Sequence, residues 1–187
     1  MCIRDSTKEG QKKLLTDINA RYRNVFNTGE LQYYGTDIYM AISEEPAERM
    51  FNGYDKTFNS TAPIVGDYWK VLYKIVQESN ILLNRCTPDI AGNDYTSLTA
   101  QARFFRAMAY YYLVETFGPV PLLTEENTSV IQQAERTGEQ AIYTFIITEL
   151  NDIKDKLDMT TISAGKVTNA AAVSYTHLRA HETKANL

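Results

Sequence analysis

The side chains best suited to hold a ligand gather in one irregular segment, residues 43–62. It has no lasting hydrophobic period and contains Pro46, Gly53 and several Asn and Asp residues, so we expect a long loop. Loops of this length in compact domains are often functional. Aromatic rings can stack on the apolar face of a sugar, and planar polar groups can pair with its hydroxyls. The predicted ligand-binding residues are Arg49, Asn52, Tyr54, Asp55, Phe58 and Asn59.

The same segment also has a purely structural interpretation. Phe51 and Phe58 would then pin the loop to neighbouring helices, while Asn52 and Asn59 would cap turns. The residue types fit both interpretations, so both stay open at this point.

Catalytic chemistry finds less support. Glycoside hydrolysis needs two carboxylates held about 5–10 Å apart across a cleft, and the sequence offers two adjacent pairs, Glu44–Glu45 and Glu125–Glu126. Adjacent acidic residues usually point apart, and on a surface they are usually solvated. There is also no nucleophile elbow and no glycine-rich phosphate loop. We therefore assign no catalytic residues and predict that the protein is not an enzyme.

The only two histidines, His177 and His181, are four residues apart, which on a helix would place both imidazoles on one face. No cysteine lies nearby, and both fall in residues 173–187. That segment and residues 1–6 resemble translated sequencing-adaptor sequence, so we exclude both from the prediction of the fold. We predict no metal site and no cofactor, and we expect three parts: a non-native leader (1–6), a helical region (7–172) and a non-native tail (173–187).

Composition bounds the class of protein. The 187-residue chain is 44% hydrophobic and 11% aromatic, which is enough for one domain with a core. Its formal net charge of −4 argues against nucleic-acid binding, which needs a basic face. No run of 18 apolar residues is present that would span a membrane as a helix.

Helical periodicity dominates the chain, and no segment shows convincing strand alternation. We expect helices over about 7–27 and 31–42, and from about 63 to an end at 86–88, followed by a turn-rich connection at 89–95. Thr137 to Gln140 has the spacing of a capping box before a further helix reaching Leu157, and another helix opens at 166–172. These elements predict an all-α fold.

The stretch 100–124 is the most informative of these elements. Ala102, Phe105 and Ala109 belong to one apolar stripe, whereas Phe104 and Met108 belong to a second. A helix that is apolar on two faces packs between two neighbours. Gly118 then ends the helix, and the two prolines that follow keep the chain extended. Arg103 and Arg106 on this largely buried helix need acidic or carbonyl partners, or an exposed end.

The order of residues in this stretch resembles the signature helix of the SusD/RagB family of cell-surface nutrient-binding lipoproteins. The matching residues are Arg103, Arg106, Ala107, Tyr110, Leu113, Phe117, Gly118, Val120, Pro121 and Leu122. Further similarity lies in residues 31–37, in the spacing of Trp69, Tyr73, Val76 and Asn80, and in that of Tyr143, Ile146, Glu149 and Leu150. The resemblance covers most of residues 7–172.

The resemblance implies a tetratricopeptide-like stack of helix pairs with a long irregular loop, truncated from a larger SusD-like fold. It also implies a function: binding an oligosaccharide, or in some members a peptide, at the surface of the outer membrane. Such a protein would act as the lid of a SusC-like TonB-dependent transporter and would be held by a lipid anchor that we do not find in this sequence. The alternative is a tetratricopeptide-like scaffold that binds a protein or peptide in its groove, and a glycoside hydrolase is a third possibility.

Overall fold

The computed structural model describes residues 7–27, 31, 50–51, 59, 61–129, 133–158 and 166–176. Its long helices are α1 (Lys8–Asn27), α4 (Pro63–Arg85), α6 (Tyr95–Phe117) and α7 (Glu139–Ile153). Short elements are α5 (Pro88–Ala91), η2 (Gly92–Asp94) and η3 (Lys154–Lys156), and a further helix covers 169–176. In these parts of the chain no strand forms, and one isolated antiparallel bridge joins Val120 to Thr137. The all-α prediction is confirmed. The helix expected over 31–42 lies outside the described residues apart from residue 31.

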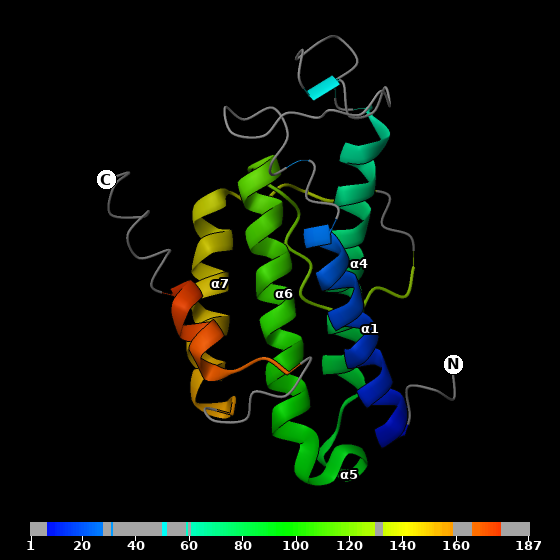
Figure 1. Ribbon diagram of the computed structural model, residues 1–187, viewed down its shortest axis with the longest axis vertical. Helices are drawn as coiled ribbons and strands as arrows, with labels where there is room; N and C mark the ends of the chain where they lie inside the picture. The colour runs from blue at the N-terminus through cyan, green and yellow to red at the C-terminus, as the bar shows by residue number, and fades with distance from the viewer. Residues whose placement is uncertain are drawn as a thin grey trace.

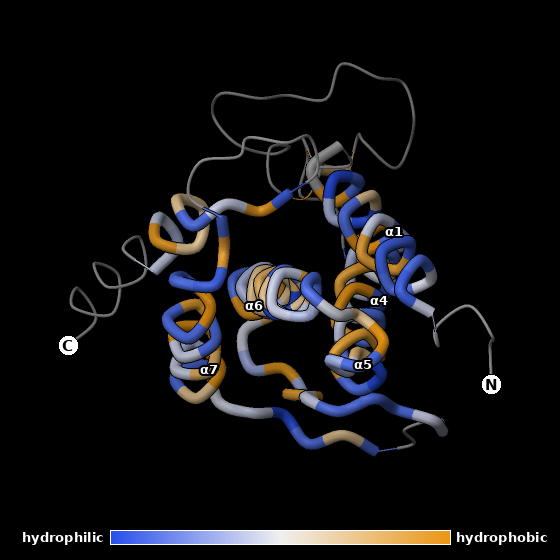
Figure 2. The backbone as a smooth tube through the Cα atoms, turned by 90° about the horizontal axis from the view of Figure 1, so that it is seen from below, coloured by the Kyte–Doolittle hydropathy of each residue, from blue (hydrophilic) through white to orange (hydrophobic). Residues whose placement is uncertain are grey.

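The four long helices run in alternating directions, as expected for a stack of helix pairs (Figure 1). Helix α6 is the centre of the stack and lies between α4 and α1 on one side and α7 on the other (Figure 2). Its side chains at Ala102, Ala107 and Ala109 are fully buried, so the neighbouring helices can approach closely. The prediction of a helix buried on more than one face is therefore confirmed.

The neighbours of α6 are amphipathic and each turns an apolar face towards it. Leu72 and Ile75 of α4 and Ile18 of α1 are fully buried in this common core, and so are Ile142 and Ile153 of α7. Hydrophobic burial between helices far apart in the sequence therefore holds the stack together.

Both ends of α4 follow from local chemistry. Pro63 occupies the first turn, where its missing N–H costs nothing. The helix ends at Arg85, since Cys86 and Thr87 are extended before Pro88. The connection expected at 89–95 contains two short helices, α5 and η2, and α6 begins at its last residue, Tyr95.

The predicted capping box at the start of α7 is wrong. Helix α7 begins at Glu139, and Gly138, which has no side chain to donate or accept, is its N-cap residue. Thr137 instead belongs to the bridge, where its N–H donates to the carbonyl oxygen of Val120 at 3.0 Å. Thr137, which the local spacing assigned to the helix, therefore pairs with the extended exit from α6.

The helix over 169–176 continues past residue 172, the last residue of the predicted helical region. Its Tyr175 ring lies 6.3 Å from the ring of Phe104 and 6.0 Å from that of Tyr111, both on α6. The division of the chain at residues 6 and 172 stays a prediction. Within the described helices, none is both long and apolar enough to cross a membrane.

Candidate functional site

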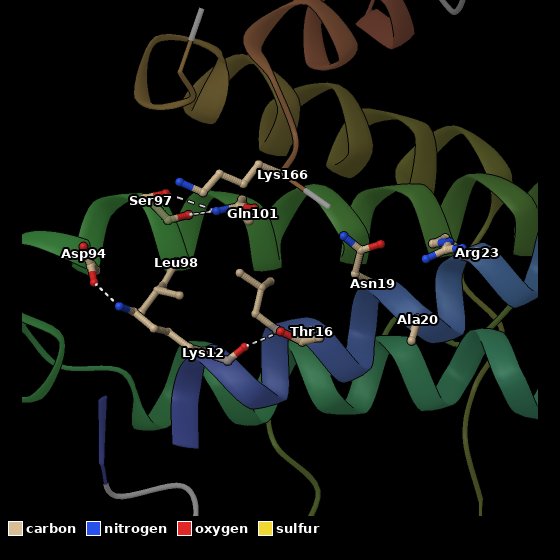
Figure 3. A pocket seen from close by; sticks show the side chains of 11 residues that line it. Lys12, Thr16, Asn19, Ala20, Arg23, Asp94, Ser97, Leu98, Gln101 and Lys166 are labelled. Atoms are coloured by element: carbon tan, nitrogen blue, oxygen red, sulfur yellow. Dashed lines mark hydrogen bonds and ion pairs between the residues drawn. The ribbon is translucent and has the colours of Figure 1, made fainter. Parts of the chain in front are cut away.

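A cleft of about 560 Å³ opens between α1 and α6 beside the segment that leads into the last helix (Figure 3). Its walls carry polar and charged side chains over an aliphatic floor. They are Lys12, Leu15, Thr16, Asn19, Ala20, Arg23, Asp94, Ser97, Leu98, Gln101 and Lys166.

Sequence reasoning did not select this cleft, although α1 carried a signal for it. Lys12, Thr16, Asn19 and Arg23 follow one another at spacings of four, three and four residues, which form a polar stripe on one helix face. A polar stripe is normally only a solvated face. The wall that α6 and Lys166 add is non-local, so the stripe becomes a cleft only in the folded chain.

Five of the six predicted ligand-binding residues lie outside the described residues. These are Arg49, Asn52, Tyr54, Asp55 and Phe58. The sixth, Asn59, is exposed and forms a tight turn before α4, because its Oδ1 accepts hydrogen bonds from the N–H and the hydroxyl of Thr61 at 2.8 and 2.6 Å. Its carbonyl oxygen accepts from the N–H of Ala62 at 3.0 Å. This geometry agrees with the turn-capping interpretation of Asn59, and its ligand role stays a prediction.

A small apolar cluster lies beside the first turn of α4, and its residues Met50 and Phe51 are helical where the sequence predicted a loop. Phe51 is 3% exposed and is buried together with Met50 and Ala62. Leu31, Ile64 and Val65 pack against this cluster. The expectation that Phe51 pins the loop to the helices is confirmed.

An aromatic group lies within the next two turns of α4. The ring of Trp69 is 5.0 Å from that of Phe117 and 4.8 Å from that of Tyr73. The hydroxyl of Tyr73 donates to the carbonyl oxygen of Pro121 at 2.8 Å, and burial raises the pKa of this phenol, so it remains a donor. This group fixes the end of α6 and its extended exit against α4.

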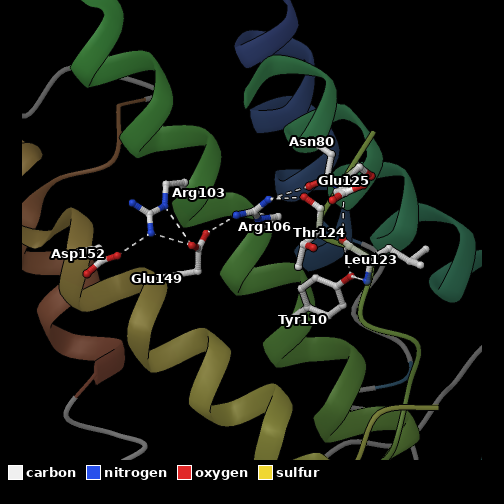
Figure 4. Close-up of polar contacts among 9 residues, drawn as sticks. All are labelled: Asn80, Arg103, Arg106, Tyr110, Leu123, Thr124, Glu125, Glu149 and Asp152. Atoms are coloured by element: carbon white, nitrogen blue, oxygen red, sulfur yellow. Dashed lines mark hydrogen bonds and ion pairs between the residues drawn. The ribbon is translucent and has the colours of Figure 1, made fainter. Parts of the chain in front are cut away.

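The extended exit, residues 118–127, is held by buried side chains of α6 and α4 (Figure 4). Burial raises the pKa of Tyr110 to about 12. Its protonated hydroxyl donates to the carbonyl oxygen of Leu123 at 2.9 Å and accepts from the N–H of the same residue at 2.6 Å. Asn80 Nδ2 donates to the carbonyl oxygens of Leu123 and Glu125, each at 3.0 Å.

Arg106 connects this exit to α7. Its Nη1 donates to Asn80 Oδ1 at 2.8 Å and to the carbonyl oxygen of Thr124 at 3.2 Å, while its Nη2 donates to Glu149 Oε2 at 2.6 Å. Arg103 holds the other oxygen of Glu149, with its Nη2 at 2.7 Å from Oε1. The expectation that both arginines need acidic or carbonyl partners is confirmed.

Of the carboxylates considered for catalysis, Glu126 is held in an ion pair with Arg85. Glu126 accepts hydrogen bonds from Arg85 and from Asn84, and these bonds lower the pKa of its carboxyl group. A carboxylate held ionised in this way is a poor general acid. Glu44 and Glu45 are outside the described residues, as are His177 and His181. Among the described residues no group of three or more His, Cys, Asp and Glu side chains is placed to hold a metal ion.

The fold is a tetratricopeptide-like helical stack, and side chains of its central helix α6 hydrogen-bond to the extended segment that follows this helix. A family model described as "Starch-binding associating with outer membrane" matches residues 8–177. The chain therefore belongs to the SusD-like family, as the signature helix predicted.

Curated relatives and solved structures agree with this family. A SusD-like protein of Formosa agariphila is 30% identical over 115 residues, which cover 60% of this chain and 23% of the relative. A SusD-like protein of Bacteroides ovatus is 31% identical over 110 residues, which cover 56% of this chain and 20% of the relative. The chain thus matches about a fifth of the length of these relatives.

Two solved structures share the fold. A laminarin-binding SusD-like protein superposes with a TM-score of 0.79 at 23% identity, over 96% of this chain and 41% of its own. A protein crystallised with xylogluco-oligosaccharide superposes with a TM-score of 0.69 at 22% identity, over 88% of this chain and 33% of its own. The description of the family model names starch binding and association with the outer membrane.

Proposed function

We propose that this chain belongs to a nutrient-binding protein that captures an oligosaccharide at the cell surface, without catalysis. The observation that carries the proposal is the match of the SusD-like family model to residues 8–177. Two solved proteins of the same fold support a glycan as the ligand, because one is laminarin-binding and the other was crystallised with xylogluco-oligosaccharide.

The binding residues in this proposal are those of the 43–62 loop: Arg49, Asn52, Tyr54, Asp55, Phe58 and Asn59. The support for this assignment is the residue types of the loop, which combine aromatic rings with planar polar groups. Rings at Tyr54 and Phe58 would stack on sugar faces, and the Asn, Asp and Arg side chains would pair with hydroxyls.

The proposal extends to the place of this protein in uptake. It would act as the lid of a SusC-like TonB-dependent transporter in the outer membrane, where a lipid anchor would hold it. Specificity would come from stacking and hydrogen bonds, and the transporter would supply the translocation. The ligand class is an oligosaccharide, with a peptide nutrient as the alternative.

Calorimetric titration of the 187-residue chain with laminari- and xylogluco-oligosaccharides tests the binding role. Replacing Tyr54 and Phe58 by Ala should weaken binding about tenfold, because each stacked ring contributes roughly 0.5–1.5 kcal/mol. The matched control is Tyr54→Phe, which keeps the ring and should keep most of the affinity. Unchanged affinity of a folded double-alanine variant would refute the loop assignment. Release of new reducing ends from either glycan would refute the absence of catalysis.

A further inference from the structure

The cleft between α1 and α6 is cationic in a chain that is acidic overall. Three of its lining residues are positively charged (Lys12, Arg23 and Lys166) and one is negatively charged (Asp94), whereas the whole chain has a formal net charge of −4. A concave site with one sign of charge concentrates ligands of the opposite sign. An anionic ligand is therefore favoured here.

Only part of this positive charge is already neutralised. Lys12 Nζ lies 2.9 Å from Asp94 Oδ2, and Lys8 Nζ lies 3.1 Å from the same oxygen. One carboxylate therefore faces two ammonium groups, and the hydrogen bonds from these lysines lower the pKa of Asp94. Arg23 and Lys166 are exposed and have no ion-pair partner in the part of the chain that the structure describes. They remain available for a ligand.

The uncharged side chains that line the cleft also indicate which kind of anion would fit. The cleft has the aliphatic side chains of Leu15 and Leu98 and no aromatic ring among its lining residues. Gln101, 4% exposed, donates from Nε2 to the hydroxyl of Ser97 at 3.1 Å, while its Oε1 has no hydrogen-bond partner among the described residues. Lys166 extends beside Gln101 and Ser97 (Figure 3). A ligand with acidic groups, aliphatic groups and an N–H donor would match all three features.

We propose that this cleft binds an extended, acidic segment of polypeptide. Lys12 and Arg23 are eleven residues apart on α1, or about 16 Å at the rise of an α-helix, which equals about five residues of extended chain. Acidic side chains of the segment pair with Arg23 and Lys166, and aliphatic carbons cover Leu15 and Leu98. A backbone N–H of the segment donates to Gln101 Oε1, which is buried without a hydrogen-bond partner among the described residues, after a local rearrangement of the cleft. An acidic sugar fits less well, because the lining offers no ring for stacking.

This inference does not rest on the proposed glycan function, because the cleft shares no residue with the 43–62 loop. The two can therefore fail separately. Glycan binding without hexaglutamate binding would overturn only the cleft, and hexaglutamate binding at the cleft without glycan binding would overturn only the glycan role of the loop.

The test measures fluorescence anisotropy of fluorescein-labelled hexaglutamate with the 187-residue chain. We expect saturable binding that weakens when NaCl is raised from about 50 to about 300 mM, since salt screens exposed charges. Arg23→Gln and Lys166→Gln should each weaken binding about threefold, and the double variant about tenfold. Lys13→Gln is the matched control, because it removes an exposed charge from α1 beside, but not within, the cleft.

Three results would overturn the proposal. The first is no binding of hexaglutamate at the lower salt concentration. The second is equal affinity of the wild-type protein and the Arg23→Gln, Lys166→Gln double variant. The third is stronger displacement of the probe by trigalacturonate than by unlabelled hexaglutamate, which would make the cleft an acidic-sugar site. Circular dichroism melts of every variant confirm that the charge changes leave the fold intact.

Discussion

Replacing Glu149 by Ala should destabilise the fold more than any comparable loss of an exposed charge. Glu149 and Arg106 are 6% and 7% exposed, and their contact at 2.6 Å is the only carboxylate partner of Arg106 in the described residues. The substitution leaves the guanidinium buried with only the neutral partners Asn80 Oδ1 and the Thr124 carbonyl oxygen. Arg106 Nε already has no hydrogen-bond partner among the described residues. Removing the Glu149 carboxylate would leave Nη2 of the same guanidinium without its partner as well.

Breaking a buried ion pair by removing one partner costs about 3–5 kcal/mol. For a chain of this size 1 kcal/mol corresponds to about 2–4 °C, so Tm should fall by roughly 6–20 °C. The matched control is Asp152→Asn, because Asp152 also binds Arg103, at 3.0 Å, but is 55% exposed. An exposed pair contributes about 1 kcal/mol or less.

Urea unfolding followed by circular dichroism and by the fluorescence of Trp69, the only tryptophan, measures both variants. Trp69 is a suitable reporter because it contacts Phe117 at the end of α6. A Glu149→Ala variant within about 1 kcal/mol of the wild type, or equal to Asp152→Asn, would refute the assignment of Arg106 as a buried charge that depends on Glu149.

Three further substitutions test the contacts around the exit from α6. The pKa of Glu126 is lowered from 4.5, so its stabilising contribution is present above about pH 4.5 and is lost as pH falls through the lower folded pKa. Glu126→Gln should therefore differ most from the wild type in unfolding free energy near neutral pH. A difference in unfolding free energy that widened in acid would contradict this. Tyr110→Phe should cost about 1–3 kcal/mol, because it leaves the N–H of Leu123 without its partner, while the carbonyl keeps the hydrogen bond from Asn80. An unchanged denaturant midpoint would argue against the bond to this N–H. Gly118→Ala should lower Tm by several degrees, since φ is 69° and a Cβ would lie 3.2 Å from Glu139 Oε1; a raised Tm would be the opposite result.

Most of the fold was predictable from the sequence because it is encoded in helical periodicity. The helices predicted over 7–27 and from 63 to an end at 86–88 agree closely with α1 and α4, since apolar spacing and the prolines at 63 and 88 are local signals. The two-faced apolar pattern of α6 likewise predicted its central place. The capping box failed because a non-local contact, the Val120–Thr137 bridge, placed Thr137 in the extended exit.

The binding sites were less predictable for the same reason. Residue types predicted a binding role for segment 43–62, and the burial of Phe51 against α4 confirmed the predicted packing of this ring. Most of the predicted ligand-binding residues lie outside the described residues. The cleft escaped prediction because its parts come from α1, α6 and the segment at 166, which periodicity treats as unrelated.

The sequence alone determined the helices, the central burial of α6 and the membership of the SusD-like family, because apolar spacing and the signature residues are written locally in the chain. It also indicated that Arg103 and Arg106 need partners. Only the tertiary structure decided that Glu149 of α7, Asn80 of α4 and the carbonyl of Thr124 are those partners. These contacts join residues 18 to 46 positions apart, and packing, not local propensity, brings such residues together.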